Sequence, residues 1–286
     1  MKRLKKPIFI IGAARSGTTL VGDILNKHKD IAYWVEPKYI WRYRNASSST
    51  DIRKGKEATL AVQKYIHSKF SNYVKQCKKK RFMEKTPSNC FRIPFIYKIF
   101  PDGRFLHIIR DGRDVAFSAQ KKWSSSPNPT ALWRRVVSFE IPLRDAPCYA
   151  KDVIRDVIGR QFLPKKAFIW GPRFPGIYDI QKQYSTIETC AIQWYQSVLA
   201  AMEGLREIPA KQQMTFKFEE LLSTPESLLR QVLKFTDLEP ETNVFNYALT
   251  KIDQTATRRW EQKEACKVKL IEPYIHDLLF ELGYER

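Results

Sequence analysis

The clearest pattern near the start of the chain is an apolar run, then small residues, then a helical repeat. Ile8–Ile11 is wholly apolar and rich in β-branched side chains, which predicts a buried strand of a parallel sheet. Gly12–Gly17 follows as a loop, and apolar residues then recur with helical spacing over Thr18–Leu25. Because the first amides of a helix lack partners within it and its dipole favours negative charge there, this order predicts an anion-binding cradle.

Similar apolar segments recur along the chain and alternate between strand and helix patterns. Strand patterns occur near residues 31–35, 81–86, 105–109 and 214–218, and helical patterns near 57–73, 189–205 and 225–235. Alternating strands and helices are typical of an α/β domain. We therefore predict a P-loop-like three-layer fold, with a central parallel sheet of about five strands, helices on both faces and a helical insertion.

The composition indicates one domain. The 286 residues are 43% hydrophobic, so we predict a single domain over residues 1–286 with one large core. Residues 121–182 are rich in aromatic, basic and proline side chains, and this insertion is where we expect a substrate to be selected. No segment approaches the roughly 20 apolar residues of a membrane span, which predicts a cytoplasmic protein. The five cysteines form no Cys-x-x-Cys pair, so neither a disulfide framework nor a metal site is expected.

The formal net charge of +20 is the strongest signal in the composition. Such a charge suits an anionic partner, whether a nucleic acid, an anionic lipid, an acidic glycan or a substrate with several negative charges. No nucleic-acid-binding motif accompanies it, so specific recognition of nucleic acid is not expected.

The cradle departs from that of nucleoside triphosphatases. Their pattern is G-x-x-x-x-G-K-[ST], in which the lysine reaches the phosphates and the hydroxyl binds magnesium. Gly12 and Gly17 keep the glycine spacing, but Thr18 stands at the lysine position and Arg15 supplies the cation. This arrangement predicts an anion held by the loop without a metal ion.

The segment Ala13–Thr19 resembles the 5′-phosphosulfate loop of sulfotransferases that use 3′-phosphoadenosine 5′-phosphosulfate (PAPS), whose form is roughly P-[RK]-S-G-T-T. The motifs are closest to the bacterial and tyrosyl-protein branch, and Ala14 replaces the usual proline. The resemblance implies that Arg15 is catalytic and that the loop binds the 5′ end of the donor through Arg15, Ser16, Gly17, Thr18 and Thr19.

A second strand-to-helix turn carries another anion-binding pattern. The apolar strand Phe105–Ile109 leads to Arg110, then to a helix that Asp111 is placed to cap. Arg110 and Ser118 can converge on one anion, because residues 114 and 118 share a helix face. Arginine suits a phosphate, since its planar guanidinium donates two parallel hydrogen bonds. The pair resembles the 3′-phosphate motif of the same family.

Two residues at predicted strand ends are candidates for the chemistry. Glu36 precedes Pro37, which predicts an extended backbone at the edge of the sheet where ligands bind. The resemblance implies that Glu36 is the general base, and that Lys85, which begins a Lys-Thr-Pro sequence, stabilises the departing oxygen. The alternative for Glu36 is a surface glutamate paired with Lys38 or Arg42.

Other charged residues compete with these or extend the site. Glu84 is a rival acid or base, but strand alternation predicts that it points away from the face of Lys85. His107 lies inside an apolar strand, which favours a buried core histidine. Residues 255–260 resemble a basic loop of the family, and this implies a further 3′-phosphate contact from Arg259.

Together these motifs predict a PAPS-dependent sulfotransferase that transfers the sulfuryl group in line to an acceptor hydroxyl, or alternatively to an amine. The acceptor is expected to be a glycan, a lipid or a small metabolite, either anionic or aromatic, bound by the insertion at about 121–182. Two other classes stay open. A nucleotide-dependent kinase would share the strand, loop and helix, and a non-catalytic polyanion-binding protein would explain the charge alone. The sequence does not indicate the oligomeric state.

Overall fold

A single parallel sheet forms the centre of the computed structural model, which describes residues 4–123, 169–263 and 265–285. Its strands are β1 (Ile8–Ile11), β2 (Ile31–Val35), β3 (Arg81–Lys85), β4 (Arg104–Ile109) and β5 (Gln213–Lys217), in the spatial order β2-β3-β1-β4-β5. All four pairings are parallel. The predicted five-stranded sheet is therefore confirmed, and all its carboxyl ends meet at one edge.

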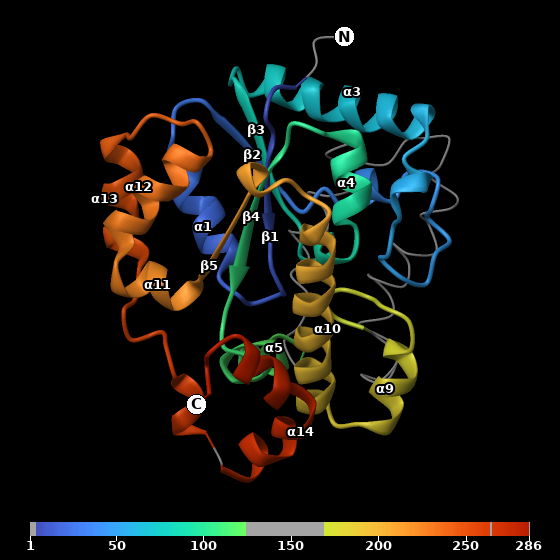
Figure 1. Ribbon diagram of the computed structural model, residues 1–286, viewed down its shortest axis with the longest axis vertical. Helices are drawn as coiled ribbons and strands as arrows, with labels where there is room; N and C mark the ends of the chain where they lie inside the picture. Colours follow the sequence, from blue (N-terminus) through green and yellow to red (C-terminus); the bar gives the residue numbers. More distant parts are fainter. Residues whose placement is uncertain (1–3, 124–168, 264, 286) are drawn as a thin grey trace.

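Helices cover both faces of this sheet (Figure 1). They are α1 (Thr18–Leu25), α2 (Lys38–Trp41), α3 (Leu60–Gln76), α4 (Ile93–Ile99), α5 (Gly112–Trp123), α9 (Ile177–Gln183), α10 (Thr186–Arg206), α11 (Phe218–Ser223), α12 (Pro225–Phe235), α13 (Thr242–Lys251) and α14 (Ala265–Glu281). Short 3₁₀ turns add η1 (Gly55–Glu57), η2 (Pro87–Phe91), η5 (Ala210–Gln212) and η6 (Arg259–Gln262). The predicted three-layer arrangement is confirmed.

Alternation along the central strand divides the core in two. Ile8 and Ile10 pack with α1, α11, α12 and α13, whereas Phe9 and Ile11 pack with α3, α4 and the later part of α10. Every residue of β1 is buried, because a central parallel strand is covered on both faces. The strand thus carries the glycine loop that follows it on a rigid support.

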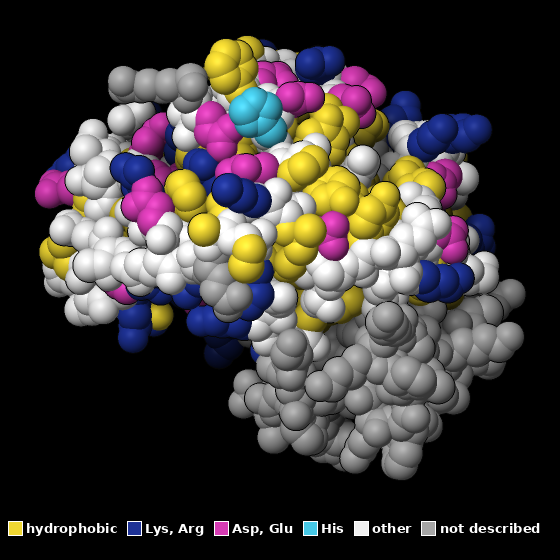
Figure 2. Space-filling model, turned by 90° about the horizontal axis from the view of Figure 1, so that it is seen from below, with side chains coloured by type: hydrophobic (Ala, Val, Ile, Leu, Met, Phe, Trp, Pro, Cys, Tyr) yellow, Lys and Arg dark blue, Asp and Glu magenta, His cyan; other side chains and the backbone are white. Residues whose placement is uncertain are grey.

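A third apolar cluster lies beyond the carboxyl edge of the sheet. It joins Ala13 of the loop to apolar side chains of α5, α10 and α14. In Figure 1 the helices α5 and α14 lie below the ends of the strands. Figure 2 views this end of the molecule from below, and dark-blue basic side chains are spread around its margin with yellow apolar side chains between them.

The long helix α10 begins earlier than the apolar pattern predicts. Ser185 caps it, and Glu188 accepts a hydrogen bond from the Ser185 amide at 2.9 Å, which completes a capping box. Most of the predicted insertion at 121–182 lies outside the described residues. Within it the structure describes residues 121–123 and 169–182, which include most of α9. Among the described helices, none has the length and apolar character that crossing a bilayer requires.

The aromatic cluster under α3 provides a test of the core. Phe70 is fully buried, stacks on Phe82 at 4.2 Å and meets Trp41 edge-on at 5.1 Å between ring centroids. We expect Phe70→Ala to lower the free energy of unfolding by about 3–5 kcal/mol, because it removes a large ring and leaves a cavity. Leu60→Ala on the same helix, where the side chain is 74% exposed, should change it by less than about 0.5 kcal/mol. Urea unfolding of both variants measures the difference, and equal losses would contradict this account of the core.

Candidate active site

The glycine loop after β1 takes its shape from left-handed backbone conformations. Gly17 is the N-cap of α1 with φ of 85°, and Arg15 has φ of 76°. The amide of Ser16 donates to the carbonyl of Ala13 at 3.1 Å and closes the turn. A Cβ on Gly17 would lie 2.2 Å from the ring of Phe218, so both the conformation and the contact require glycine there.

Polar side chains of the loop are divided between its interior and its surface. Ser16 is fully buried, and its hydroxyl has no hydrogen-bond partner. Thr18 is buried at the first turn of α1, whereas Arg15 and Thr19 are exposed. A buried hydroxyl without a partner is costly unless a ligand satisfies it. The loop therefore has the chemistry of an anion site, with exposed groups above a buried hydroxyl.

Arg15 connects this loop to the second predicted phosphate motif. Its Nε donates to the Ser118 hydroxyl at 3.0 Å, and its carbonyl accepts from Nη1 of Arg110 at 3.4 Å. Partial desolvation by the surrounding loop, together with the neighbouring charge of Arg110, lowers the pKa of Arg15. The structure thus brings Arg15, Arg110 and Ser118 together, although 95 residues separate the two arginines in sequence.

The guanidinium of Arg110 is held on several sides. It lies 4.7 Å above the ring centre of Phe218, and its Nη2 donates to Asp114 at 3.3 Å and to the carbonyl of Ala256 at 2.7 Å. Its Nε is buried without a partner. A fixed, desolvated arginine with an unused donor suits a phosphate oxygen.

Asp114 belongs to the site as well, although its sequence pattern alone did not identify it. Its carboxylate pairs with Arg110 and accepts from the amide of Trp260 at 2.9 Å, so it joins α5 to the loop before α14. Burial raises the pKa of Asp114 in spite of the opposing charge of Arg110. The signal was its spacing of four residues from Arg110, which places both on one face of the turn.

The cap predicted for α5 is present. Asp111 accepts from the amide of Arg113 at 2.9 Å, as an N-cap side chain does. The Arg113 guanidinium also binds the Asp111 carboxylate and covers the ring of Trp260 at 3.9 Å. These contacts fix the helix that carries Ser118.

The contacts of Arg259 lie within its own loop. Its guanidinium binds the carboxylate of Asp253 and the carbonyl of Thr255, and its side chain is 50% exposed. The loop itself does reach the site, through the carbonyl of Ala256. The side-chain role of Arg259 stays a prediction.

Glu36 and Lys85 meet at the ends of neighbouring strands. Nζ of Lys85 donates to Oε1 of Glu36 at 2.7 Å, and the Glu36 amide donates to the Lys85 carbonyl at 2.9 Å. The Lys85 side chain is only 4% exposed, whereas that of Glu36 is 31% exposed. The carboxylate of Glu36 is therefore the member of the pair that an incoming molecule can reach.

The predicted extended backbone at Glu36 is wrong, because its φ is 53°. Proline disfavours the right-handed helical region for the preceding residue but leaves the left-handed region open. The Lys38 amide donates to the Glu36 carbonyl at 2.6 Å around Pro37, whose φ and ψ are −70° and 59°. These values define an inverse γ-turn. The left-handed backbone of Glu36 costs about 1–3 kcal/mol, typical of conformations held at functional sites.

The two rival acid or base residues are both buried. Glu84 is fully buried and accepts hydrogen bonds from Thr86 at 2.8 Å and from Asn89. His107 is 1% exposed within β4, and burial lowers its pKa to about 4. Neither side chain is exposed at the strand ends, as Glu36 is.

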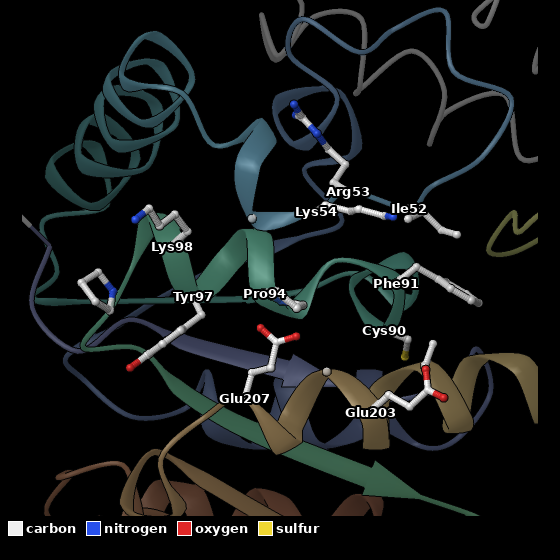
Figure 3. Close-up of a pocket in the computed structure, with 14 residues that line it drawn as sticks. Ile52, Arg53, Lys54, Cys90, Phe91, Pro94, Tyr97, Lys98, Glu203 and Glu207 are labelled. Atoms are coloured by element: carbon white, nitrogen blue, oxygen red, sulfur yellow. The ribbon is translucent and has the colours of Figure 1, made fainter.

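A surface cavity of about 820 Å³ lies away from these residues. Figure 3 shows it between η1, α4 and the later part of α10, with Glu203 on α10, Glu207 at the C-cap of α10 and Lys98 on α4. None of its 14 lining residues belongs to the predicted site. Within residues 4–123, 169–263 and 265–285, no group of three His, Cys, Asp or Glu side chains is placed to hold a metal ion.

The sheet order and the loop define a P-loop-like α/β protein in which an arginine inside the loop replaces the usual lysine. A sequence profile of the sulfotransferase family matches residues 7–169 and 152–242. The chain belongs to the sulfotransferase family, and the predicted family is confirmed.

Individual relatives are distant. An uncharacterised protein of Aquifex aeolicus is 24% identical over 262 residues, which cover 86% of this chain and 27% of that protein. The protein-tyrosine sulfotransferase of Drosophila melanogaster is 22% identical over 244 residues, which cover 81% of this chain and 38% of that protein. The chain thus spans well under half the length of these two curated relatives.

Solved structures show the same fold. A sulfotransferase of Mycobacterium avium superimposes with a TM-score of 0.53 at 12% identity, covering 98% of this chain and 77% of that chain. The sulfotransferase domain from the curacin biosynthetic pathway superimposes with a TM-score of 0.50 at 13% identity, covering 96% of this chain and 99% of that chain. These similarities support the P-loop-like architecture.

The contact between Gly17 and Phe218 yields a prediction about the loop. We expect Gly17→Ala to lower the free energy of unfolding by about 1–3 kcal/mol, because the substitution strains the backbone and pushes into the ring. Gly176→Ala is a matched control, since Gly176 also has positive φ but its Cβ would meet nothing within 4 Å. The control reports the backbone cost alone. Equal losses in urea unfolding would show that the Phe218 contact contributes nothing.

Proposed function

We propose that the chain transfers the sulfuryl group of PAPS to an acceptor hydroxyl. The observation that carries this proposal is the hydrogen bond from Arg15 to Ser118, which joins two cationic strand-to-helix turns into one site. A nucleotide with phosphates at both its 5′ and 3′ positions needs two such turns, whereas a nucleoside triphosphate needs one. Membership of the sulfotransferase family supports the same assignment.

The residues present fit this donor. Ser16 and Arg110 each hold a buried polar atom without a partner, one at each turn. The glycine loop and the amides at the start of α1 would hold the 5′-phosphosulfate, with Arg15, Ser16, Thr18 and Thr19 around it. Arg110 and Ser118 would hold the 3′-phosphate. The bound donor supplies the sulfuryl group for transfer.

Glu36 would then accept the proton of the acceptor, and Lys85 would stabilise the negative charge on the departing oxygen. Glu36 takes the proton of the acceptor hydroxyl while that oxygen bonds to sulfur. The bond from sulfur to the 5′-phosphate oxygen breaks, and this oxygen keeps the electron pair. Protonation neutralises Glu36 and weakens its ion pair with Lys85, so the ammonium becomes available to the departing oxygen.

The acceptor carries the hydroxyl that receives the sulfuryl group. Glycans, lipids and small metabolites all remain candidates, and an amine is the alternative to a hydroxyl. The Drosophila relative, whose name specifies protein tyrosine, adds a tyrosyl side chain to these candidates. The residues 124–168, where we expect much of the acceptor to bind, lie outside the described part of the chain. A cytoplasmic location also stays a prediction.

Ligand binding separates this proposal from its rivals. The desulfated donor, 3′-phosphoadenosine 5′-phosphate, should raise the melting temperature more than ATP with magnesium does. A larger shift with ATP and magnesium would favour a kinase. Binding of heparin with steep salt dependence, and no turnover of PAPS, would favour a polyanion-binding protein.

Arg110→Ala should weaken binding of 3′-phosphoadenosine 5′-phosphate by about 1.5–3 kcal/mol, because it removes charge-assisted hydrogen bonds to the 3′-phosphate. Arg230→Ala is the matched control, since Arg230 is exposed on α12 and pairs with Glu226. Calorimetry with and without the 3′-phosphate measures the effect. Unchanged preference for the 3′-phosphorylated nucleotide would refute the role of Arg110.

Glu36→Gln should lower kcat by about 100-fold or more while the affinity for the donor product stays within about twofold, because the variant keeps the shape of the site but cannot accept the proton. Release of 3′-phosphoadenosine 5′-phosphate from labelled PAPS is the assay, with Glu226→Gln on exposed α12 as the control. An extract of the source organism supplies the acceptor. Full turnover by Glu36→Gln would exclude this residue as the base.

A further inference from the structure

Glu84 is a buried acidic residue that the proposed reaction does not use. It lies in β3 immediately before Lys85 and is fully buried. Strand alternation turns it to the face where its neighbour Phe82 packs, opposite to the face of Met83. Burying a carboxylate costs free energy unless hydrogen bonds compensate it, so the partners of Glu84 matter.

Both oxygens of Glu84 bind the turn that follows Lys85. Oε2 accepts from the Thr86 hydroxyl at 2.8 Å, and Oε1 accepts from Nδ2 of Asn89. The backbone amide of Asn89 also donates to the Thr86 carbonyl at 2.9 Å, which closes the turn. One carboxylate thus holds the first and the fourth residue of the segment 86–89.

We propose that Glu84 is a positioning residue of the active site, whose carboxylate fixes the 86–89 turn and thereby the place of Lys85. The proposal rests on the proposed function, because it assumes that the place of Lys85 matters for transfer.

The sheet transmits this constraint to Glu36. Val35 pairs with Lys85 across β2 and β3, and the Glu36 amide donates to the Lys85 carbonyl. The Lys85 ammonium is then 2.7 Å from the Glu36 carboxylate. A shift of the β3 end would therefore displace both reacting groups, and small displacements at such distances cost much of the rate.

The burial of Glu84 makes its protonation relevant near neutral pH. Burial raises the pKa of Glu84 to about 7, against the hydrogen bonds from Thr86 and Asn89 and the nearby indole of Trp41 and guanidinium of Arg92. Tyr33 packs with Met83 on the opposite face of the sheet, and its hydroxyl is a further titratable group that senses the charge of Glu84. The pKa of Arg92 is affected in turn by three further charged groups, those of Asp51, Arg53 and Arg42. Arg92 itself has its pKa lowered by burial to about 10, so it stays charged when Glu84 titrates.

Protonation would weaken the hold on the turn. A neutral carboxyl offers weaker acceptors, and it must place its own hydrogen on one oxygen. Oδ1 of Asn89 is buried without a partner and can accept that hydrogen if the amide turns over. The site can therefore fold in both protonation states, but the charged state holds the turn more tightly.

The sign of the effect on stability follows from the raised pKa. The folded state binds more protons than the unfolded state between about pH 4.5 and 7, so this group makes stability fall as pH rises through that range. Glu84→Gln cannot titrate, so its free energy of unfolding should fall less from pH 5 to pH 8 than that of the wild type. Urea unfolding at both pH values measures this.

The decisive experiment compares Glu84→Gln with the wild type at pH 8 and pH 6. At pH 8 we expect amide exchange in residues 85–89 to become faster and kcat to fall about 10-fold, with the affinity for 3′-phosphoadenosine 5′-phosphate unchanged. At pH 6 the difference in kcat should shrink to about twofold, since the wild-type group is then largely protonated. Glu203→Gln, an exposed residue on α10, should match the wild type at both pH values.

If Glu84→Gln does not fold, a second pair of variants tests the same hydrogen bond from the side of Thr86. Thr86→Val removes one hydroxyl donor at nearly constant volume and should also speed exchange in 85–89, while Thr86→Ser should restore the wild-type rate. A kcat ratio that is the same at both pH values, or unchanged amide exchange, would overturn the proposal. If the wild type does not turn over PAPS at all, the proposed function fails, and amide exchange alone still decides whether Glu84 holds the turn.

Discussion

The parallel sheet forces cationic groups together, and most features of the site follow from the cost of doing so. Parallel strands end at one edge, which brings Arg15, Lys85 and Arg110 to the same end of the molecule. Desolvation there disfavours the charged forms, and like charges also repel; both effects, desolvation first, lower the pKa of Arg15. Carboxylates offset this repulsion: Glu36 pairs with Lys85, and Asp114 pairs with Arg110. Such pairing lets the fold hold positive potential in place before any anion binds.

Local patterns were enough to predict the sheet and its loops. The apolar run of β1 and the glycines at 12 and 17 act within a few residues, so their effect can be read from a short segment. The strand at Phe105–Ile109 and the cap at Asp111 were found for the same reason. Convergence of the two phosphate motifs required only the rule that parallel strands end together.

Features that depend on distant packing could not be predicted in this way. Asp114 gains its role from Trp260, 146 residues later, and no local pattern indicates that contact. The left-handed backbone of Glu36 depends on a turn around Pro37 and on pairing with β3. Arg259 pairs with Asp253, and its contact with the 3′-phosphate stays a prediction. The partner of a charged side chain on a loop depends on the folded geometry, which sequence spacing does not determine.

Opposite charges are also paired in the interior, next to the turn that follows Lys85. Burial raises the pKa of Asp51, but Arg92 and Arg173 outweigh it and bring the value to about 2. The Asp51 carboxylate also accepts from Ser88 at 2.9 Å and from the Arg173 amide at 2.9 Å. It therefore ties the turn after β3 to the chain just beyond the undescribed segment 124–168. Arg173 lies within residues 121–182, where we expect the acceptor to be selected, so the network connects the described end of that insertion to the strand end that carries Lys85. Removing one partner of such a buried network leaves an uncompensated charge, so its parts hold their positions together rather than separately.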